Sequence, residues 1–197
     1  MSKVIVYEWM SLDGVAQGPT APDEDTSGDF EHGGWHVRYF DDMARGDAVR
    51  AITGASGFLF GRRTFEQFAR YWPDASPEEQ VIAEPLNTKP KHVASATLQD
   101  PLPWQNSELL KGGVAQAVQA LKDQEDGYLL VIGSAGLVHT LLSHDLVDEI
   151  RLMIDPVILG SGKRLFGDAA APRLLELVST KQTTTGAILA TYARTEK

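Results

Sequence analysis

One strand constrains the fold of this chain more than any other segment. Residues 128–132 (YLLVI) are apolar at every position and form the longest uninterrupted apolar run in the sequence. A strand of this kind is typical of a parallel sheet that helices cover on both faces. The run ends at Gly133, and apolar residues at helical spacing follow at once: Leu137, Val138, Leu141, Leu142 and Leu146. The sequence therefore predicts an α/β protein with a buried central strand.

The rest of the chain alternates between strand and helix patterns. We predict strands at residues 3–9, 57–60, 91–94, 107–110, 128–132, 149–159, about 174–180 and 187–194. Apolar residues at helical spacing predict helices at about residues 40–52, 62–72, 114–121 and 134–146, the last capped by Ser134. This order implies one α/β domain over residues 1–197, with a mixed sheet that is parallel where helices cross over and antiparallel near its end. Pro156 interrupts the strand at 149–159, which predicts a bulge or a sheet edge there.

Composition excludes several classes of protein. The chain has 27 acidic and 18 basic residues, a formal net charge of −9, which argues against a nucleic-acid partner. It has no cysteine, so disulfides, thiolate metal sites and cysteine nucleophiles are excluded, and we predict no metal site. A membrane-spanning helix needs about 18 apolar residues, and every apolar run in the sequence is far shorter. We expect a soluble, cytoplasmic protein with no membrane partner.

The turn after the central strand has the character of a phosphate site. In VIGSAGLV, the strand ends in Gly133-x-x-Gly136 and opens directly into a helix. The first amides of a helix lack acceptors and carry partial positive charge, so they favour a phosphate. Glycines allow the backbone to approach such a ligand closely. The alternative is a tight turn whose glycines serve packing alone.

A second strand end carries the sequence Gly61-Arg-Arg-Thr64 at the beginning of a helix. Arg62 and Arg63 provide planar guanidinium groups that suit a phosphate, although they could equally pair with surface carboxylates. Ser95 ends a third strand and can donate a hydrogen bond to the same ligand. Ligands of open α/β sheets bind at such strand ends, and an extended anion such as a dinucleotide fits all three. The usual G-x-G-x-x-G fingerprint of dinucleotide-binding folds is missing.

Several segments together resemble the dihydrofolate reductase-like superfamily. The similarity is greatest to stand-alone proteins like the C-terminal reductase domain of the bifunctional riboflavin-biosynthesis deaminase-reductase. It extends nearly end to end, through SLDGVAQGP, EDTSGDFEHGGW, FLFGRRTFEQFARYWP, KHVAS, VIGSAGLVHTLLSHDLVDEIRL and DPVILGSGKRLFGD. The resemblance implies a three-layer α/β fold, an eight-stranded mixed sheet flanked by helices, with NADPH at the strand ends.

The resemblance also assigns cofactor-binding residues by position. Gly61, Arg62, Arg63 and Thr64 are expected to hold the pyrophosphate and the adenosine 2′-phosphate, with Ser95 on the adenosine side, and the pyrophosphate is also expected on Gly133, Ser134, Ala135, Gly136 and Leu137. Two arginines beside a ribose favour NADPH over NADH, because a 2′-phosphate binds well to a guanidinium fork.

The substrate side is expected in and around the first long loop. The resemblance makes Asp13 a substrate or nicotinamide contact, although Asp-Gly is also a common turn pair. Residues 14–36 are rich in Gly, Pro, Asp and His and have no period, which is typical of a functional lid. Within this loop Trp35 can stack on a flat heterocycle. His32 can relay a proton, the alternative being an ordinary surface histidine.

Other charged residues allow two interpretations each. Asp41 and Asp42 lie where dihydrofolate reductases place a substrate-binding carboxylate, and they equally suit the first turn of a helix. Lys163 and Arg164 can bind a substrate phosphate, contribute to a dimer contact, or lie in a solvated loop.

The sequence thus predicts an NADPH-dependent reductase of a small heterocycle, most like 5-amino-6-(5-phosphoribosylamino)uracil reductase. The alternatives are a pterin or dihydrofolate reductase, and a nucleotide- or flavin-binding protein with little catalysis. Because similar proteins pair through strands like 149–159, a homodimer is expected.

Overall fold

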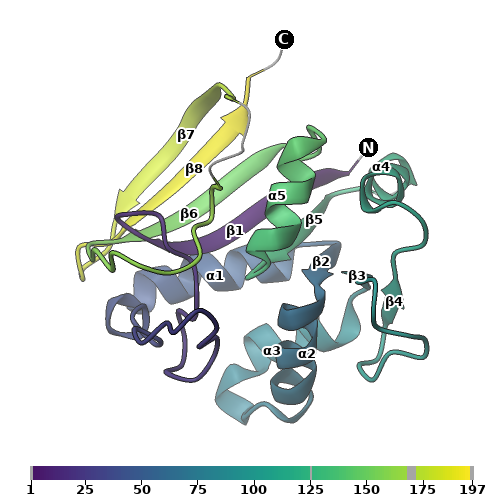
Figure 1. Ribbon diagram of the computed structural model, residues 1–197, viewed down its shortest axis with the longest axis horizontal. Helices are drawn as coiled ribbons and strands as arrows, with labels where there is room; N and C mark the ends of the chain where they lie inside the picture. The colour runs from purple at the N-terminus through teal and green to yellow at the C-terminus, as the bar shows by residue number, and fades with distance from the viewer. Residues whose placement is uncertain (1, 125, 168–171, 196–197) are drawn as a thin grey trace.

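The computed structural model describes residues 2–124, 126–167 and 172–195 and contains one eight-stranded sheet (Figure 1). Its strands are β1 (Lys3–Ser11), β2 (Gly57–Gly61), β3 (Lys91–Ala94), β4 (Ser107–Leu109), β5 (Tyr128–Ile132), β6 (Glu149–Asp155), β7 (Leu175–Gln182) and β8 (Ile188–Arg194). They lie in the order β4-β3-β2-β5-β1-β6-β8-β7. The first six are mutually parallel, and β8 is antiparallel to both of its neighbours. The mixed sheet predicted from the sequence is confirmed.

Within the described residues, five α-helices cover the sheet in two layers. They are α1 (Asp42–Gly54), α2 (Arg62–Tyr71), α3 (Gln80–Thr88), α4 (Val114–Gln124) and α5 (Ala135–Ser143), with short 3-10 helices η1 (Val37–Tyr39), η2 (Trp72–Asp74) and η3 (Pro77–Glu79). Side chains of α4 and α5 pack with Val4 and Val6 of β1 in one core. Side chains of α1, α2 and α3 pack with Ile5 and Tyr7 of the same strand in another. Because alternate residues of a strand face opposite sides, the sheet lies between two helical layers, as the resemblance implied (Figure 1).

The sequence did not predict α3. Pro85 lies inside this helix and removes one backbone donor, which weakens the helical signal. The helix end is completed by Lys91 of β3, which is fully buried. Its ammonium group donates hydrogen bonds to the carbonyls of Leu86, Asn87 and Lys89, at 2.8, 3.3 and 3.0 Å. Burial lowers the pKa of Lys91 to about 8.

The prediction for residues 149–159 was wrong in two respects. β6 ends at Asp155, so Pro156 follows the strand and does not interrupt it. β6 also lies between β1 and β8 and is not a sheet edge. The outermost strand on this side is β7 (Figure 1). Its residues are all exposed. A proline that lacks an amide donor is tolerated here because the ladder has already ended.

The parallel arrangement places the carboxyl ends of β1, β2, β3, β5 and β6 at one edge of the sheet. The loop at residues 14–36 lies at this edge and has a small core of its own, formed by Val15, Phe30 and Trp35. No helix among the described residues is both long and apolar enough to cross a membrane.

Candidate functional site

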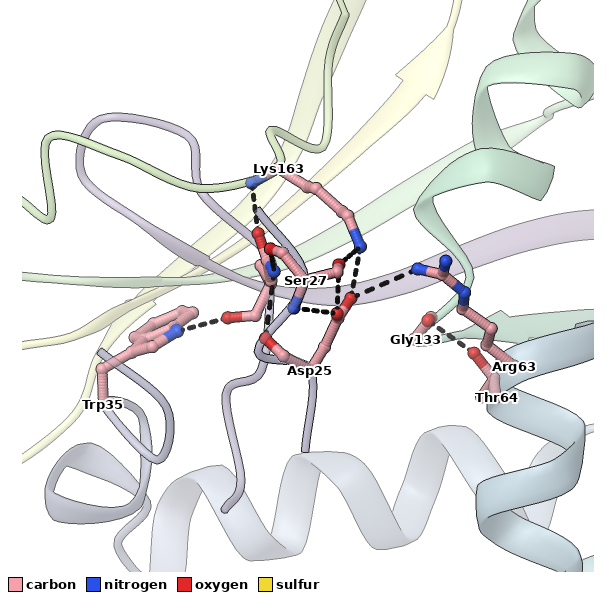
Figure 2. Close-up of polar contacts among 8 residues, drawn as sticks. Asp25, Ser27, Trp35, Arg63, Thr64, Gly133 and Lys163 are labelled. Carbon is pink, nitrogen blue, oxygen red and sulfur yellow. Dashed lines mark hydrogen bonds and ion pairs between the residues drawn. The ribbon is translucent and has the colours of Figure 1, made fainter. Parts of the chain in front are cut away.

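The two glycine-bearing strand ends are joined by direct hydrogen bonds. The amide of Gly61 donates to Oγ of Ser134 at 3.0 Å, across 73 positions of sequence. Oγ1 of Thr64 donates to the carbonyl of Gly133 at 2.6 Å (Figure 2). Oγ of Ser134 donates to Oγ1 of Thr64 at 3.0 Å. These bonds form because β2 and β5 are neighbours in the sheet. The starts of α2 and α5 therefore lie side by side.

Ser134 occupies the N-cap position of α5, but its side chain makes no cap hydrogen bond, contrary to the prediction. Instead, the hydroxyl accepts a hydrogen bond from the amide of Gly61 and donates one to the hydroxyl of Thr64. The first hydrogen bond within the helix runs from the amide of Val138 to the carbonyl of Ser134. The amides of residues 135–137 come before it, so they have no acceptor within the helix.

The glycines of this turn fit a phosphate that approaches the backbone. Gly133 has a φ of +64°, a conformation that disfavours other residues. Gly136 has no such constraint, and a Cβ there would meet no atom within 4 Å. Nothing within the described chain thus requires glycine at 136, whereas a ligand phosphate beside the amides would need the open space.

Glu8 lies directly behind this turn. It is 5% exposed, and its Oε1 accepts the amide of Ser134 at 3.0 Å. Burial raises the pKa of Glu8 to about 8, although the amides of Ser134 and Gly133 act in the opposite direction. A carboxyl group that holds a proton near neutral pH avoids placing a negative charge behind the predicted phosphate position.

The two predicted arginines both lie at the start of α2 and are partly exposed. Arg62 pairs with Glu66 at 2.9 Å. Arg63 lies 3.7 Å from Asp25, a residue of the 14–36 loop (Figure 2). Both guanidinium groups thus have carboxylate neighbours, as the alternative interpretation expected, and exposed pairs of this kind exchange readily with other anions.

Ser95 follows β3, the neighbour of β2. Its Oγ accepts the amides of Thr97 and Leu98 at 3.2 and 3.0 Å and so holds the turn after the strand. The strand order β3-β2-β5 therefore places Ser95, the Gly61–Thr64 segment and the Gly133–Leu137 segment in one row along the sheet edge.

Asp13 ties the turn after β1 to the loop after β6. It accepts hydrogen bonds from Oγ of Ser11 and from the amides of Leu159 and Gly160, at 2.8, 3.1 and 2.9 Å. Burial raises the pKa of Asp13, but these bonds outweigh that effect and bring the pKa to about 2. Such a carboxylate is ionised at neutral pH and carries no proton to donate. Its contact with substrate or nicotinamide stays a prediction.

Trp35 and His32 belong to the 14–36 loop, and both contact Phe30 of the same loop. Trp35 is 7% exposed, packs against Val15 and Phe30, and donates its indole N–H to the carbonyl of Gln17 at 2.8 Å. Its ring is therefore used within the loop (Figure 2). His32 is exposed and contacts the edge of Phe30. Their roles toward a substrate stay predictions.

Asp41 has a structural role at the start of α1. It caps the helix by accepting the amide of Ala44 at 2.9 Å. It also accepts the amide and hydroxyl of Thr184 at 2.8 and 2.5 Å, which ties α1 to the turn between β7 and β8. Of the two interpretations of this carboxylate, the structure favours the helix cap.

A buried His–Asp pair is the feature that the sequence analysis missed. Nδ1 of His36 lies 2.8 Å from Oδ2 of Asp155, and the two side chains are 2% and 0% exposed. The ring of Trp9 stacks on His36 with centroids 4.2 Å apart. Nε2 of His36 and Oδ1 of Asp155 have no hydrogen-bond partner among the described residues. Burial raises the pKa of Asp155, and His36 offsets part of that effect.

The pair lies at the same sheet edge as the glycine turns. Asp155 ends β6, and Trp9 is near the end of β1, which separates β6 from β5. The sequence predicted a strand over residues 149–159, with Asp155 inside it, and only the structure shows that the strand ends at Asp155. A separate hollow of about 530 Å³ lies between the start of β6 and the end of β8, at the opposite edge, and is not part of this site.

Comparison with known proteins identifies the family of this chain. The profile of the RibD C-terminal domain matches residues 2–189. The chain belongs to the RibD C-terminal domain family. An uncharacterised Bacillus subtilis protein, YyaP, is 32% identical over 136 residues, which cover 68% of this chain and 71% of YyaP.

Solved structures share the fold of this RibD C-terminal domain protein. A putative riboflavin biosynthesis protein from Shewanella matches with a TM-score of 0.70 and 21% identity, over all of both chains. The Thermotoga maritima deaminase/reductase matches with a TM-score of 0.65 and 13% identity, over 98% of this chain and 57% of its own. Enterococcus faecalis dihydrofolate reductase, solved with NADP(H), matches with 0.60 and 13%, over 98% and 97%. The dihydrofolate reductase-like fold is thereby confirmed.

The raised pKa of Glu8 predicts a pH dependence of stability. The folded chain keeps the Glu8 proton up to about pH 8, whereas the unfolded chain loses it near 4.5. Between these values the folded state binds more protons, so the free energy of unfolding falls as pH rises. Denaturant titrations at pH 5 to 9 should show that Glu8→Gln lacks this part of the decline. Glu84→Gln, at an exposed position of α3, is the control. Equal slopes for Glu8→Gln and the native chain would contradict the assignment.

Proposed function

We propose that this RibD C-terminal domain protein is an NADPH-dependent reductase of a small heterocycle, most like 5-amino-6-(5-phosphoribosylamino)uracil reductase. The observation that carries the proposal is the junction of the two helix starts, where Gly61, Thr64, Gly133 and Ser134 are hydrogen-bonded to one another. It offers amides, open space at Gly136 and two nearby guanidinium groups to one extended anion. Family membership and the shared fold support the same assignment.

In this proposal, the strand order sets the direction of the cofactor along the row of strand ends. The adenosine phosphate side belongs near Ser95 after β3, and the pyrophosphate belongs between the starts of α2 and α5. Neighbouring strands are about 4.8 Å apart, so the next positions along the row are the ends of β1 and β6. NADPH supplies a hydride when bound. A cofactor bound in this direction would bring its nicotinamide end toward Trp9 and the His36–Asp155 pair, and this pair is our candidate for the group that holds a proton for the substrate.

Turnover with a panel of heterocycles tests the reaction. NADPH oxidation should occur with 5-amino-6-(5-phosphoribosylamino)uracil, and oxidation with dihydrofolate alone would identify a pterin reductase.

Cofactor preference tests the two arginines. The double variant Arg62→Ala, Arg63→Ala should raise the dissociation constant for NADPH about tenfold or more and leave that for NADH nearly unchanged, because only NADPH has the 2′-phosphate. Arg45→Ala with Arg50→Ala on α1 is the matched control. Equal losses for the two cofactors would contradict the placement, and binding without any turnover would indicate a binding protein.

Gly136 provides a test of the phosphate position that is independent of turnover. A methyl group there meets no atom of the described chain, so Gly136→Ala should leave the free energy of unfolding unchanged or raise it by up to about 1 kcal/mol. The same methyl group fills the phosphate space, and the dissociation constant for NADPH should rise at least about tenfold by fluorescence titration. Gly46→Ala, within α1, is the control. Native affinity in Gly136→Ala would place the cofactor elsewhere.

We also propose a homodimer, formed through β7 and not through β6. Leu175, Leu177 and Val178 of β7 are 41%, 54% and 58% exposed. β7 is hydrogen-bonded to β8 on one side, and no other strand of the described chain pairs with its outer side (Figure 1). Soluble proteins generally blunt or cover such an edge, and a second copy of the chain covers it with identical apolar residues.

The dimer prediction is tested by molar mass in solution. Light scattering should give twice the chain mass for the native protein. The double variant Leu177→Lys, Val178→Lys should have the single-chain mass, because burying two unpaired charges in the interface costs free energy. Val81→Lys, at an apolar position of α3 that is 48% exposed, should remain dimeric. A monomeric native protein, or a dimeric β7 variant, would rule out this interface.

A further inference from the structure

A carboxylate of the chain itself lies between two cations at the candidate site. Oδ2 of Asp25 is 2.5 Å from Nζ of Lys163 and 3.7 Å from NH1 of Arg63 (Figure 2). Nζ of Lys163 also donates to Oγ of Ser27 at 2.5 Å. Burial raises the pKa of Asp25, but Lys163 and Ser27 outweigh it and bring the pKa to about 2. An anion is therefore held here by two basic side chains at neutral pH.

The two cations come from opposite sides of the glycine turns. Arg63 is in α2, which follows β2, and Lys163 is in the loop after β6. The order β2-β5-β1-β6 separates these strand ends by three spacings, about 14 Å in all. The long side chains of Arg63 and Lys163 reach from these two strand ends to the same carboxylate oxygen of Asp25.

The same cluster is tied to the glycine turn through α2. Thr64, the residue after Arg63, donates its hydroxyl to the carbonyl of Gly133 at 2.6 Å (Figure 2). Arg63 therefore begins next to the turn that is predicted to hold a phosphate.

The contact between Asp25 and the cations can be exchanged without dismantling the loop. Arg63 and Lys163 are 67% and 46% exposed, and exposed ion pairs contribute only about 0–1 kcal/mol. The backbone of the loop is held separately by buried Gln17, whose amide nitrogen donates to the carbonyls of Asp25 and Ser27 at 3.0 and 2.9 Å. A phosphate group, with more charge and more acceptor atoms, competes well for both cations.

We propose that Lys163 and Arg63 form a phosphate site that Asp25 occupies until a ligand displaces it. The ligand phosphate takes the place of the Asp25 carboxylate, so of the three roles that the sequence left open for Lys163 the proposal selects phosphate binding. The proposal rests on the reductase function for the identity of the ligand. The phosphate belongs either to the dinucleotide or to the substrate, and the experiment below separates these sources.

The test measures the affinities of three probes, NADPH, NADH and ribose 5-phosphate, by calorimetry. Asp25→Asn removes the competing charge but keeps the Gln17 contacts. It should lower the dissociation constant of a phosphate-bearing probe by about fivefold, the equivalent of one exposed ion pair. Lys163→Met should raise the dissociation constant of the same probe in both the native and the Asp25→Asn background. Asp23→Asn, an exposed residue of the same loop, should change nothing. Thermal unfolding of each variant checks that the fold is retained.

The pattern of responses identifies the phosphate. Equal tightening of NADPH and NADH assigns the pyrophosphate, tightening of NADPH alone assigns the 2′-phosphate, and tightening of ribose 5-phosphate assigns the substrate. Unchanged or weaker binding of all three probes by folded Asp25→Asn would overturn the proposal and make Asp25 a purely structural anchor. If ribose 5-phosphate responds as expected while neither dinucleotide binds, the phosphate site stands and the NADPH-dependent function fails.

Discussion

The candidate site depends on parallel pairing around one apolar strand. β5 pairs with β2 on one side and β1 on the other, both in parallel. Parallel strands deliver their following turns to the same edge, so helix starts that are distant in sequence meet there. The hydroxyls of Thr64 and Ser134 then join α2 to α5. An antiparallel partner at either position would send one of these turns to the opposite edge.

Charge is distributed around this edge in a way that suits an anionic ligand on an acidic protein. The chain has a formal net charge of −9, which repels anions at long range. At the edge itself, Arg62, Arg63 and Lys163 provide local positive charge, and the carboxyl behind the glycine turn has a raised pKa. Asp25 is the exception, since it is ionised and lies between two of the cations. Its partial exposure distinguishes it from the buried pair of His36 and Asp155.

Most strands and helices could be predicted because their patterns are local. The apolar run of β5, the helical spacing of α5 and the turn residues between them lie within a few positions of one another. α3 could not be predicted, because the side chain that completes its end, Lys91, is on β3 and is buried only after the sheet forms. The same reason explains Ser134, whose hydroxyl bonds to partners 70 or more positions away in place of its own helix.

The sequence by itself determined the α/β class, the family, and which strand ends carry glycines and arginines, since these follow from residue types at short spacing. Only the tertiary structure decided what those side chains contact. In the folded protein, Asp13 and Trp35 hold loops, and His36 of one loop lies against Asp155 at the end of β6. It also placed Asp25 between cations that follow two different strands. Contacts across more than a hundred positions depend on the strand order, and no local pattern encodes that order.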